Sequence, residues 1–185
     1  MRVSVLRISV FLAALAALPL FGQSVKIAPQ NLAPFVTSPV AVIERMLMIA
    51  DLKPGETLFD LGCGDGRILV AAGQKFGAKA VGVELNERYA NMARENLRKA
   101  NLSDAKVLQG NMLDVDFSSA DVVTLYLLTM SNDLLRPKLE QQLKPGTRVV
   151  SLDYQIRGWK PVRVEKTEAH HRRYTMYLYE MGKQR

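Results

Sequence analysis

Residues 58–67 read LFDLGCGDGR, and this stretch decides the fold. An apolar run containing Asp60 passes into three alternating glycines, Gly62, Gly64 and Gly66, and a second apolar run follows at once. Glycine has no side chain to obstruct a ligand and tolerates positive φ, so such a turn lets the backbone approach a ligand closely. The stretch therefore predicts a strand, a ligand-binding turn and a helix. A glycine-rich turn without a ligand is the alternative interpretation.

Strand and helix patterns alternate outward from this turn. We expect a helix over residues 39–50, with Ser38 as its N-cap. The remaining expected elements are strands over 57–61, 80–84, 106–109, 122–128, 148–156, 161–165 and 174–181, and helices over 67–76, 87–100 and 134–143. This alternation predicts an α/β fold with a doubly wound, mostly parallel seven-stranded sheet. The last two strands leave no room for a helix between them, so we expect them to form a C-terminal antiparallel hairpin.

The 185 residues provide one core, and the start of the chain is expected to lie outside it. Arg2 and Arg7 precede an uncharged apolar run over 8–20, the layout of a signal peptide or an N-terminal hydrophobic anchor. That run is short for a transmembrane helix, which needs about 20 residues. We expect a signal peptide or anchor over 1–23, an extended arm over 24–37 and one domain over 38–185.

Positive charge is concentrated in the last third of the chain. The formal net charge is +7, and residues 136–185 contain 12 basic and 5 acidic side chains. A basic surface attracts acidic partners or serves as a solvated face, and both interpretations stay open. Cys63 is the only cysteine, so no disulfide forms within the chain.

The acid-x-Gly-x-Gly-x-Gly spacing resembles the first motif of class I S-adenosyl-L-methionine-dependent methyltransferases, which have a Rossmann-like fold. The resemblance implies that the loop wraps the amino-acid and ribose portions of that cofactor. Glu84 follows Gly66 by 18 residues, at the end of the next expected strand, where an acidic side chain holds ribose hydroxyls in dinucleotide-binding folds. A solvent-facing glutamate is the alternative.

Relatives usually carry an aspartate where this chain has Asn111, and they use it to accept a hydrogen bond from the adenine amino group. The amide oxygen of Asn111 can accept as well, although a simple loop asparagine is nearly as good an interpretation. The residues assigned to the cofactor are Asp60, Gly62, Cys63, Gly64, Gly66, Arg67, Glu84, Leu85, Asn111 and Met112.

Four segments together resemble one subgroup of these enzymes. They are PFVTSP at 34–39, the loop at 60–67, VELN at 83–86 and LYLL at 125–128. The subgroup is the protein-lysine methyltransferases related to those of ATP synthase c-subunit and adenine nucleotide translocase, and the similarity covers about residues 34–181. The Asn/Asp-Pro-Pro-aromatic signature of nucleobase amino methylation is absent from the fourth strand end. The resemblance implies a protein partner that presents a lysine and no nucleic acid; a small-molecule O- or N-methyltransferase and a noncatalytic cofactor-binding module are the alternatives.

A lysine has a pKa of about 10.4 and must lose a proton before it can accept a methyl group. Our hypothesis is that Tyr126, with Thr37 and Phe35 of the arm, lines a narrow channel that strips water from the incoming amine. Tyr126 and Thr37 are the catalytic candidates, and a core tyrosine is the alternative for Tyr126. We expect no metal site and interpret His170 and His171 as exposed loop residues.

The N-terminal segment also predicts a location. Positive residues ahead of an apolar run direct the following domain out of the cytoplasm, so we expect an exported or membrane-associated protein. Catalysis facing the cytoplasm is the alternative, because the cofactor is made there.

Overall fold

The computed structural model describes residues 36–184. The expected signal peptide or anchor over 1–23 lies outside these residues, as do Phe35 and all of the arm except its last two residues. Between Val36 and Gln184, no helix is long and apolar enough to cross a membrane.

Seven strands form one mixed sheet in the order β3-β2-β1-β4-β5-β7-β6. The strands are β1 (Thr57–Leu61), β2 (Lys79–Glu84), β3 (Lys106–Gln109), β4 (Val122–Leu125), β5 (Arg148–Leu152), β6 (Arg163–Ala169) and β7 (Arg172–Glu180). The first five pair in parallel, whereas β7 is antiparallel to both β5 and β6. The expected doubly wound sheet with a terminal antiparallel hairpin is confirmed.

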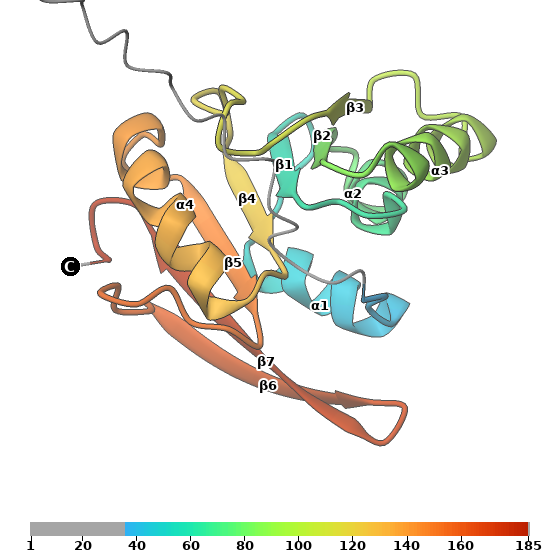
Figure 1. The fold of residues 1–185 in the computed structure, drawn as a ribbon. Coiled ribbons are helices and arrows are strands. Elements are labelled where there is room, and N and C mark those ends of the chain that lie inside the picture. The colour runs from blue at the N-terminus through green and yellow to red at the C-terminus, as the bar shows by residue number, and fades with distance from the viewer. Residues whose placement is uncertain (1–35, 185) are drawn as a thin grey trace, which may run out of the picture.

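Four helices cover the two faces of the sheet (Figure 1). They are α1 (Val40–Ile49), α2 (Arg67–Phe76), α3 (Glu87–Lys99) and α4 (Thr129–Gln142). Side chains of α1, α2 and α3 share one buried apolar cluster, whereas those of α4 belong to a second cluster on the other face. The central strands β1, β4 and β5 are buried on both sides, as β4 shows with four buried residues in a row.

Several predicted boundaries are wrong, and the largest error is at the start of α4, directly after β4. This strand ends at Leu125 rather than Leu128, and α4 begins at Thr129 rather than Leu134. The apolar residues after Leu125 resemble a strand in sequence, but the chain leaves the sheet there. Tyr126 and Leu127 line the pocket described below. The prediction missed the first turn of α4 because it contains few apolar residues, and Pro137 lies inside the helix.

Other boundaries also differ from the prediction. Ser38 is not the N-cap of α1, because Pro39 occupies that position and no side chain caps the helix. The fifth strand ends at Leu152 rather than Ile156. In the hairpin, β6 covers 163–169 rather than 161–165, and β7 begins at residue 172 rather than 174. The carboxyl ends of β1, β2 and β4 meet at one edge of the sheet, which is where ligands bind in open α/β folds.

Candidate active site

The turn after β1 requires its three glycines. Gly62, Gly64 and Gly66 have φ values of +90°, +54° and +77°, in the region that side chains disfavour. A Cβ on Gly66 would also lie 2.9 Å from the Cβ of Ala93 on α3, and one on Gly62 would lie 3.0 Å from Leu127. The glycines therefore shape the turn and let α3 pack close to it.

Backbone hydrogen bonds fix this turn against the end of β2. The N–H groups of Gly62 and Cys63 donate to the carbonyl of Val83, at 2.8 and 3.0 Å. The carboxylate of Glu84 accepts from the N–H of Gly64 at 2.9 Å and from that of Asn86 at 2.8 Å. Glu84 thus joins two turns, and each of its oxygens retains a lone pair for a ligand hydroxyl.

Asp60 supplies a buried acceptor beneath the turn. One carboxylate oxygen accepts from the Thr124 hydroxyl at 2.8 Å, whereas Oδ2 is buried and has no hydrogen-bond partner. Burial, together with the negative charges of Glu84 and Asp65, raises the pKa of Asp60 to about 7, against the opposing hydrogen bond from Thr124. An unpartnered buried carboxylate oxygen suits a cationic group, and the cofactor's amino-acid portion carries an ammonium.

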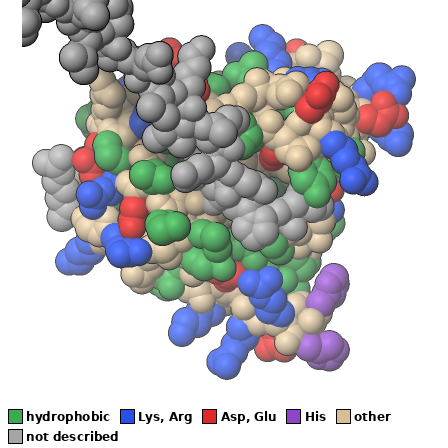
Figure 2. All heavy atoms as spheres, viewed as in Figure 1, with side chains coloured by type: hydrophobic (Ala, Val, Ile, Leu, Met, Phe, Trp, Pro, Cys, Tyr) green, Lys and Arg blue, Asp and Glu red, His purple; other side chains and the backbone are tan. Residues whose placement is uncertain are grey.

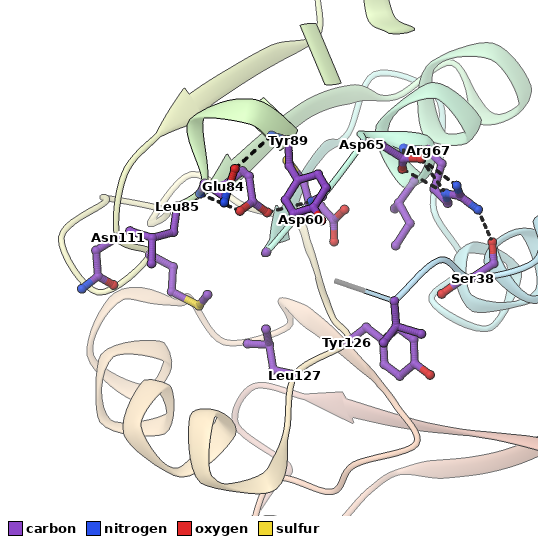
Figure 3. A pocket seen from close by; sticks show the side chains of 17 residues that line it. Ser38, Asp60, Asp65, Arg67, Glu84, Leu85, Tyr89, Asn111, Tyr126 and Leu127 are labelled. Atoms are coloured by element: carbon purple, nitrogen blue, oxygen red, sulfur yellow. Dashed lines mark hydrogen bonds and ion pairs between the residues drawn. The ribbon is translucent and has the colours of Figure 1, made fainter. Parts of the chain in front are cut away.

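These groups line one pocket at the sheet edge (Figure 3). Its lining includes most of the predicted site residues: Asp60, Gly62, Cys63, Gly64, Arg67, Glu84, Leu85, Asn111, Met112 and Tyr126. Two predicted residues are not in the lining. Gly66 lies behind the turn against Ala93, and Thr37 is exposed between Val36 and Ser38, both of which do line the pocket. The roles assigned to all of these residues remain predictions.

Three of the predicted cofactor residues have other partners as well. The Cys63 thiol packs so closely on β2 that a Cβ on Gly82 would lie 2.6 Å from its sulfur, and burial raises its pKa. The guanidinium of Arg67 pairs with Asp65 at 2.6 Å and donates to the carbonyl of Ser38 at 3.0 Å, which ties the start of α1 to the turn. The side-chain oxygen of Asn111 accepts from the N–H of Leu113 at 3.0 Å.

The end of the pocket around Asp60 and Glu84 is called the donor end below, and the end around Tyr126 the acceptor end. Sequence reasoning missed several residues at the donor end. Tyr89 lines it from the first turn of α3, and Figure 3 shows its ring beside Glu84 and Asp60. Asn86 caps the same helix, because its side chain accepts from the N–H of Arg88 at 3.0 Å. The position of Tyr89, just inside the helix that follows Glu84, was the available signal.

The opposite side of the pocket is formed by Tyr126, directly after β4 (Figure 3). Its hydroxyl donates to Oδ2 of Asp153 at 3.2 Å, and its ring lies 6.4 Å from that of Tyr154, centroid to centroid. Burial and the charge of Asp153 raise the pKa of Tyr126, while Arg172 lowers it. This side therefore combines aromatic surface with a hydroxyl and a carboxylate.

The described part of the chain contains no group of histidine, cysteine or acidic side chains arranged to hold a metal ion. His170 and His171 form the exposed turn between β6 and β7, as predicted, and they are the purple side chains at the surface in Figure 2.

Comparisons with known proteins agree with this geometry. A family model described as the ANTKMT methyltransferase domain matches residues 60–163. A protein-lysine N-methyltransferase of Saccharolobus islandicus (strain REY15A) is 47% identical over 151 residues, which cover 80% of this chain and 94% of that protein. The adenine nucleotide translocase lysine N-methyltransferase of Mus musculus is 33% identical over 132 residues, covering 71% of this chain and 57% of the mouse protein.

A solved structure is similar over almost the same region. It is that of an RNA methyltransferase from Salinibacter ruber in complex with S-adenosyl-L-homocysteine, with 40% identity and a TM-score of 0.75. The match covers 79% of this chain and 94% of the Salinibacter chain. The relatives thus share one fold, while their names differ in the methyl acceptor.

Proposed function

The chain belongs to the ANTKMT methyltransferase family, and from this premise we propose that it methylates the ε-amino group of lysine side chains in proteins. The methyl donor is S-adenosyl-L-methionine. When bound, this cofactor supplies a methyl group activated by a sulfonium. The protein has to hold the donor, align the amine and exclude water.

The donor end of the pocket fits the cofactor. The unpartnered Oδ2 of Asp60 would accept from the ammonium of its amino-acid portion. Glu84 would accept from the ribose hydroxyls while keeping its bonds to Gly64 and Asn86. Leu85 and Met112 add apolar surface for the base. Charge, hydroxyl acceptors and apolar surface are therefore present in one pocket.

The observation that carries the lysine assignment is the acceptor end of the pocket. Tyr126 presents a half-buried ring whose hydroxyl is hydrogen-bonded to Asp153. A lysine brings a long apolar stem and an amine, so an aromatic wall with oxygen acceptors matches both parts. Desolvation against the ring also favours the neutral amine, which is the nucleophilic form.

RNA is the second candidate substrate, because the Salinibacter relative at 40% identity is named an RNA methyltransferase. The residues after β4 argue against amino methylation of a base. They read Tyr126-Leu127-Leu128 and contain neither the prolines nor the polar first residue of the nucleobase signature. Lysine is therefore the better-supported acceptor.

The test is to incubate the full chain with methyl-labelled cofactor and a bacterial lysate, with Glu84→Ala as the inactive control. We expect label that resists ribonuclease, is released by protease and appears as methyl-lysine after acid hydrolysis. Label that is removed by ribonuclease would show that the methyl acceptor is RNA and not lysine. Absence of transfer to either, by a chain that binds the cofactor, would contradict the proposal.

A further inference from the structure

Asp153 follows β5 in an unusual backbone conformation. Its φ is +61°, a left-handed value that aspartate tolerates better than most side chains but that the surroundings must still enforce. The backbone of Thr175 on β7 does so: its carbonyl accepts from the Asp153 N–H at 2.7 Å, and its N–H donates to Oδ1 of Asp153 at 2.9 Å. The carboxylate is thus aimed by the hairpin.

The chain on the other side of Asp153 is fixed as well. Asn132 of α4 is fully buried, and its amide donates to the Ser151 hydroxyl at 3.3 Å and to the Tyr154 carbonyl at 3.2 Å. The Ser151 hydroxyl donates to the same carbonyl at 2.5 Å. Residues on both sides of Asp153 are therefore held by buried polar contacts, and its position is set by three elements.

Two groups of opposite character share one oxygen of this carboxylate. The Tyr126 hydroxyl donates to Oδ2 at 3.2 Å, and the Arg172 guanidinium donates to the same atom at 2.8 Å. The Asp153 side chain is 16% exposed, whereas that of Arg172 is 48% exposed. A hydrogen bond with Tyr126 is also the largest cause of the raised pKa of Arg172. The three side chains form one coupled group, in which only the arginine lies largely at the surface.

We propose that Asp153 is the positioning residue for the Tyr126 hydroxyl and that Arg172 determines how strongly the acceptor end favours a neutral over a charged amine. This inference rests on the proposed lysine activity. Because the hydroxyl donates its hydrogen bond to Asp153, its oxygen can still accept a hydrogen bond from an incoming amine. Tyr126 touches the substrate, and Asp153 acts through it.

The two charges act on the substrate with opposite sign. The Asp153 carboxylate attracts a lysine ammonium and stabilises its charged form, which aids binding and opposes deprotonation. Arg172 cancels part of that field, so it weakens binding of the ammonium and favours the neutral nucleophile. If the pair of Asp153 and Arg172 only stabilised the fold, replacing each residue would not shift ammonium binding and amine deprotonation in opposite directions.

The test compares Asp153→Asn and Arg172→Gln with Arg173→Gln, which changes the exposed neighbour on β7. Asparagine tolerates the same backbone conformation, and its oxygen can still accept from Thr175. Its amide nitrogen then stands where Oδ2 was, so the first variant removes the charge together with the hydrogen bonds from Tyr126 and Arg172. The probe is a synthetic peptide with one lysine, methylated under saturating cofactor from pH 6 to 10.

We expect Asp153→Asn to raise KM about fivefold and to move the rising limb of the kcat profile to lower pH, since that limb reports groups in the bound complex. Arg172→Gln should lower KM by a similar factor and move the limb to higher pH. Arg173→Gln should change KM less than twofold. Shifts of the same sign in the first two variants would overturn the inference.

A second readout needs no substrate. The titration of the Tyr126 phenol is followed by NMR on tyrosine-labelled full chain and assigned with Tyr126→Phe. Its pKa should fall in Asp153→Asn and rise in Arg172→Gln. Equal or same-sign shifts overturn the coupling whatever the activity. Opposite shifts in a chain that leaves the peptide unmethylated support the coupling and overturn the lysine assignment instead.

Discussion

In the donor half of the pocket, around Asp60 and Glu84, the backbone N–H groups of one tight turn bond to the end of β2. In the acceptor half, around Tyr126, side chains from the ends of β4 and β5 and from the start of β7 meet each other. The first half depends on glycine conformation and the second on the register of a hairpin. Substitutions in the two halves should therefore fail in different ways.

The largest effect is expected at Glu84, whose carboxylate joins the turn after β1 to the turn after β2. Glu84→Ala removes the acceptor for Gly64 and Asn86 and the proposed ribose contact, so cofactor affinity should fall by about 100-fold, since bonds to charged groups contribute ~1.5–3 kcal/mol each. Calorimetric titration measures it. Glu87→Ala, at an exposed position three residues later, is the control; a threefold loss or less in Glu84→Ala would refute the assignment.

Packing behind the turn gives the next effect, on stability. Gly66→Ala combines left-handed strain with a 2.9 Å clash against Ala93, so the free energy of unfolding should fall by about 3 kcal/mol. Gly55→Ala has a similar φ of +81° but open space around it, and it should cost only about 1 kcal/mol. Urea denaturation measures both losses. Equal losses would show that the packing of α3 does not depend on the absence of a side chain at Gly66.

Asp60 should reveal a conflict between stability and binding in the donor half. Its folded pKa of about 7 lies above the unfolded value of about 3.9, so the folded state binds more protons between these values and wild-type stability should rise as pH falls from 8 to 5. Asp60→Asn should remove that dependence and stabilise the free protein at pH 8 by roughly 2 kcal/mol.

The same variant should bind the cofactor about tenfold more weakly, because the ammonium loses its charged partner. Thermal unfolding across pH and calorimetry measure the two effects. A variant that is less stable at pH 8 would mean that Asp60 is already compensated in the free protein.

Substitutions in the acceptor half should change the reaction with the substrate and leave cofactor affinity nearly unchanged. Tyr126→Phe keeps the ring and removes the hydroxyl, so kcat should fall about tenfold, equivalent to ~1.4 kcal/mol, while cofactor affinity stays within twofold. Steady-state kinetics with the lysine peptide and calorimetry provide the comparison, with Tyr177→Phe on β7 as a control. Unchanged kcat would leave Tyr126 as a packing residue.

The donor half could be predicted from sequence because residue type marks it: glycines form its turn, and acidic residues lie near the ends of two apolar strands. Positive φ is expected at Gly62, Gly64 and Gly66 because they are glycines. The apolar pattern also predicts correctly where β1 and β2 end, beside Asp60 and at Glu84. The bounds of β1, α2 and β3 were predicted without error for the same reason, since each is flanked by glycine, proline or polar turns.

The acceptor half could be predicted only in part. Tyr126 was identified, but as the interior of a strand that ends one residue before it. The expected strand over 148–156 includes Asp153, but nothing in the neighbouring residues encodes a left-handed aspartate or pairing with Thr175, 22 residues away. Those contacts follow from the register of β5 against β7, which an apolar pattern does not specify.

A crystal structure with S-adenosyl-L-homocysteine tests the division into donor and acceptor halves most directly. The account predicts ribose hydroxyls within hydrogen-bonding distance of Glu84, the amino group at Oδ2 of Asp60, and the sulfur facing Tyr126. A ligand whose sulfur faces Asn111, at the other end of the pocket in Figure 3, would contradict it.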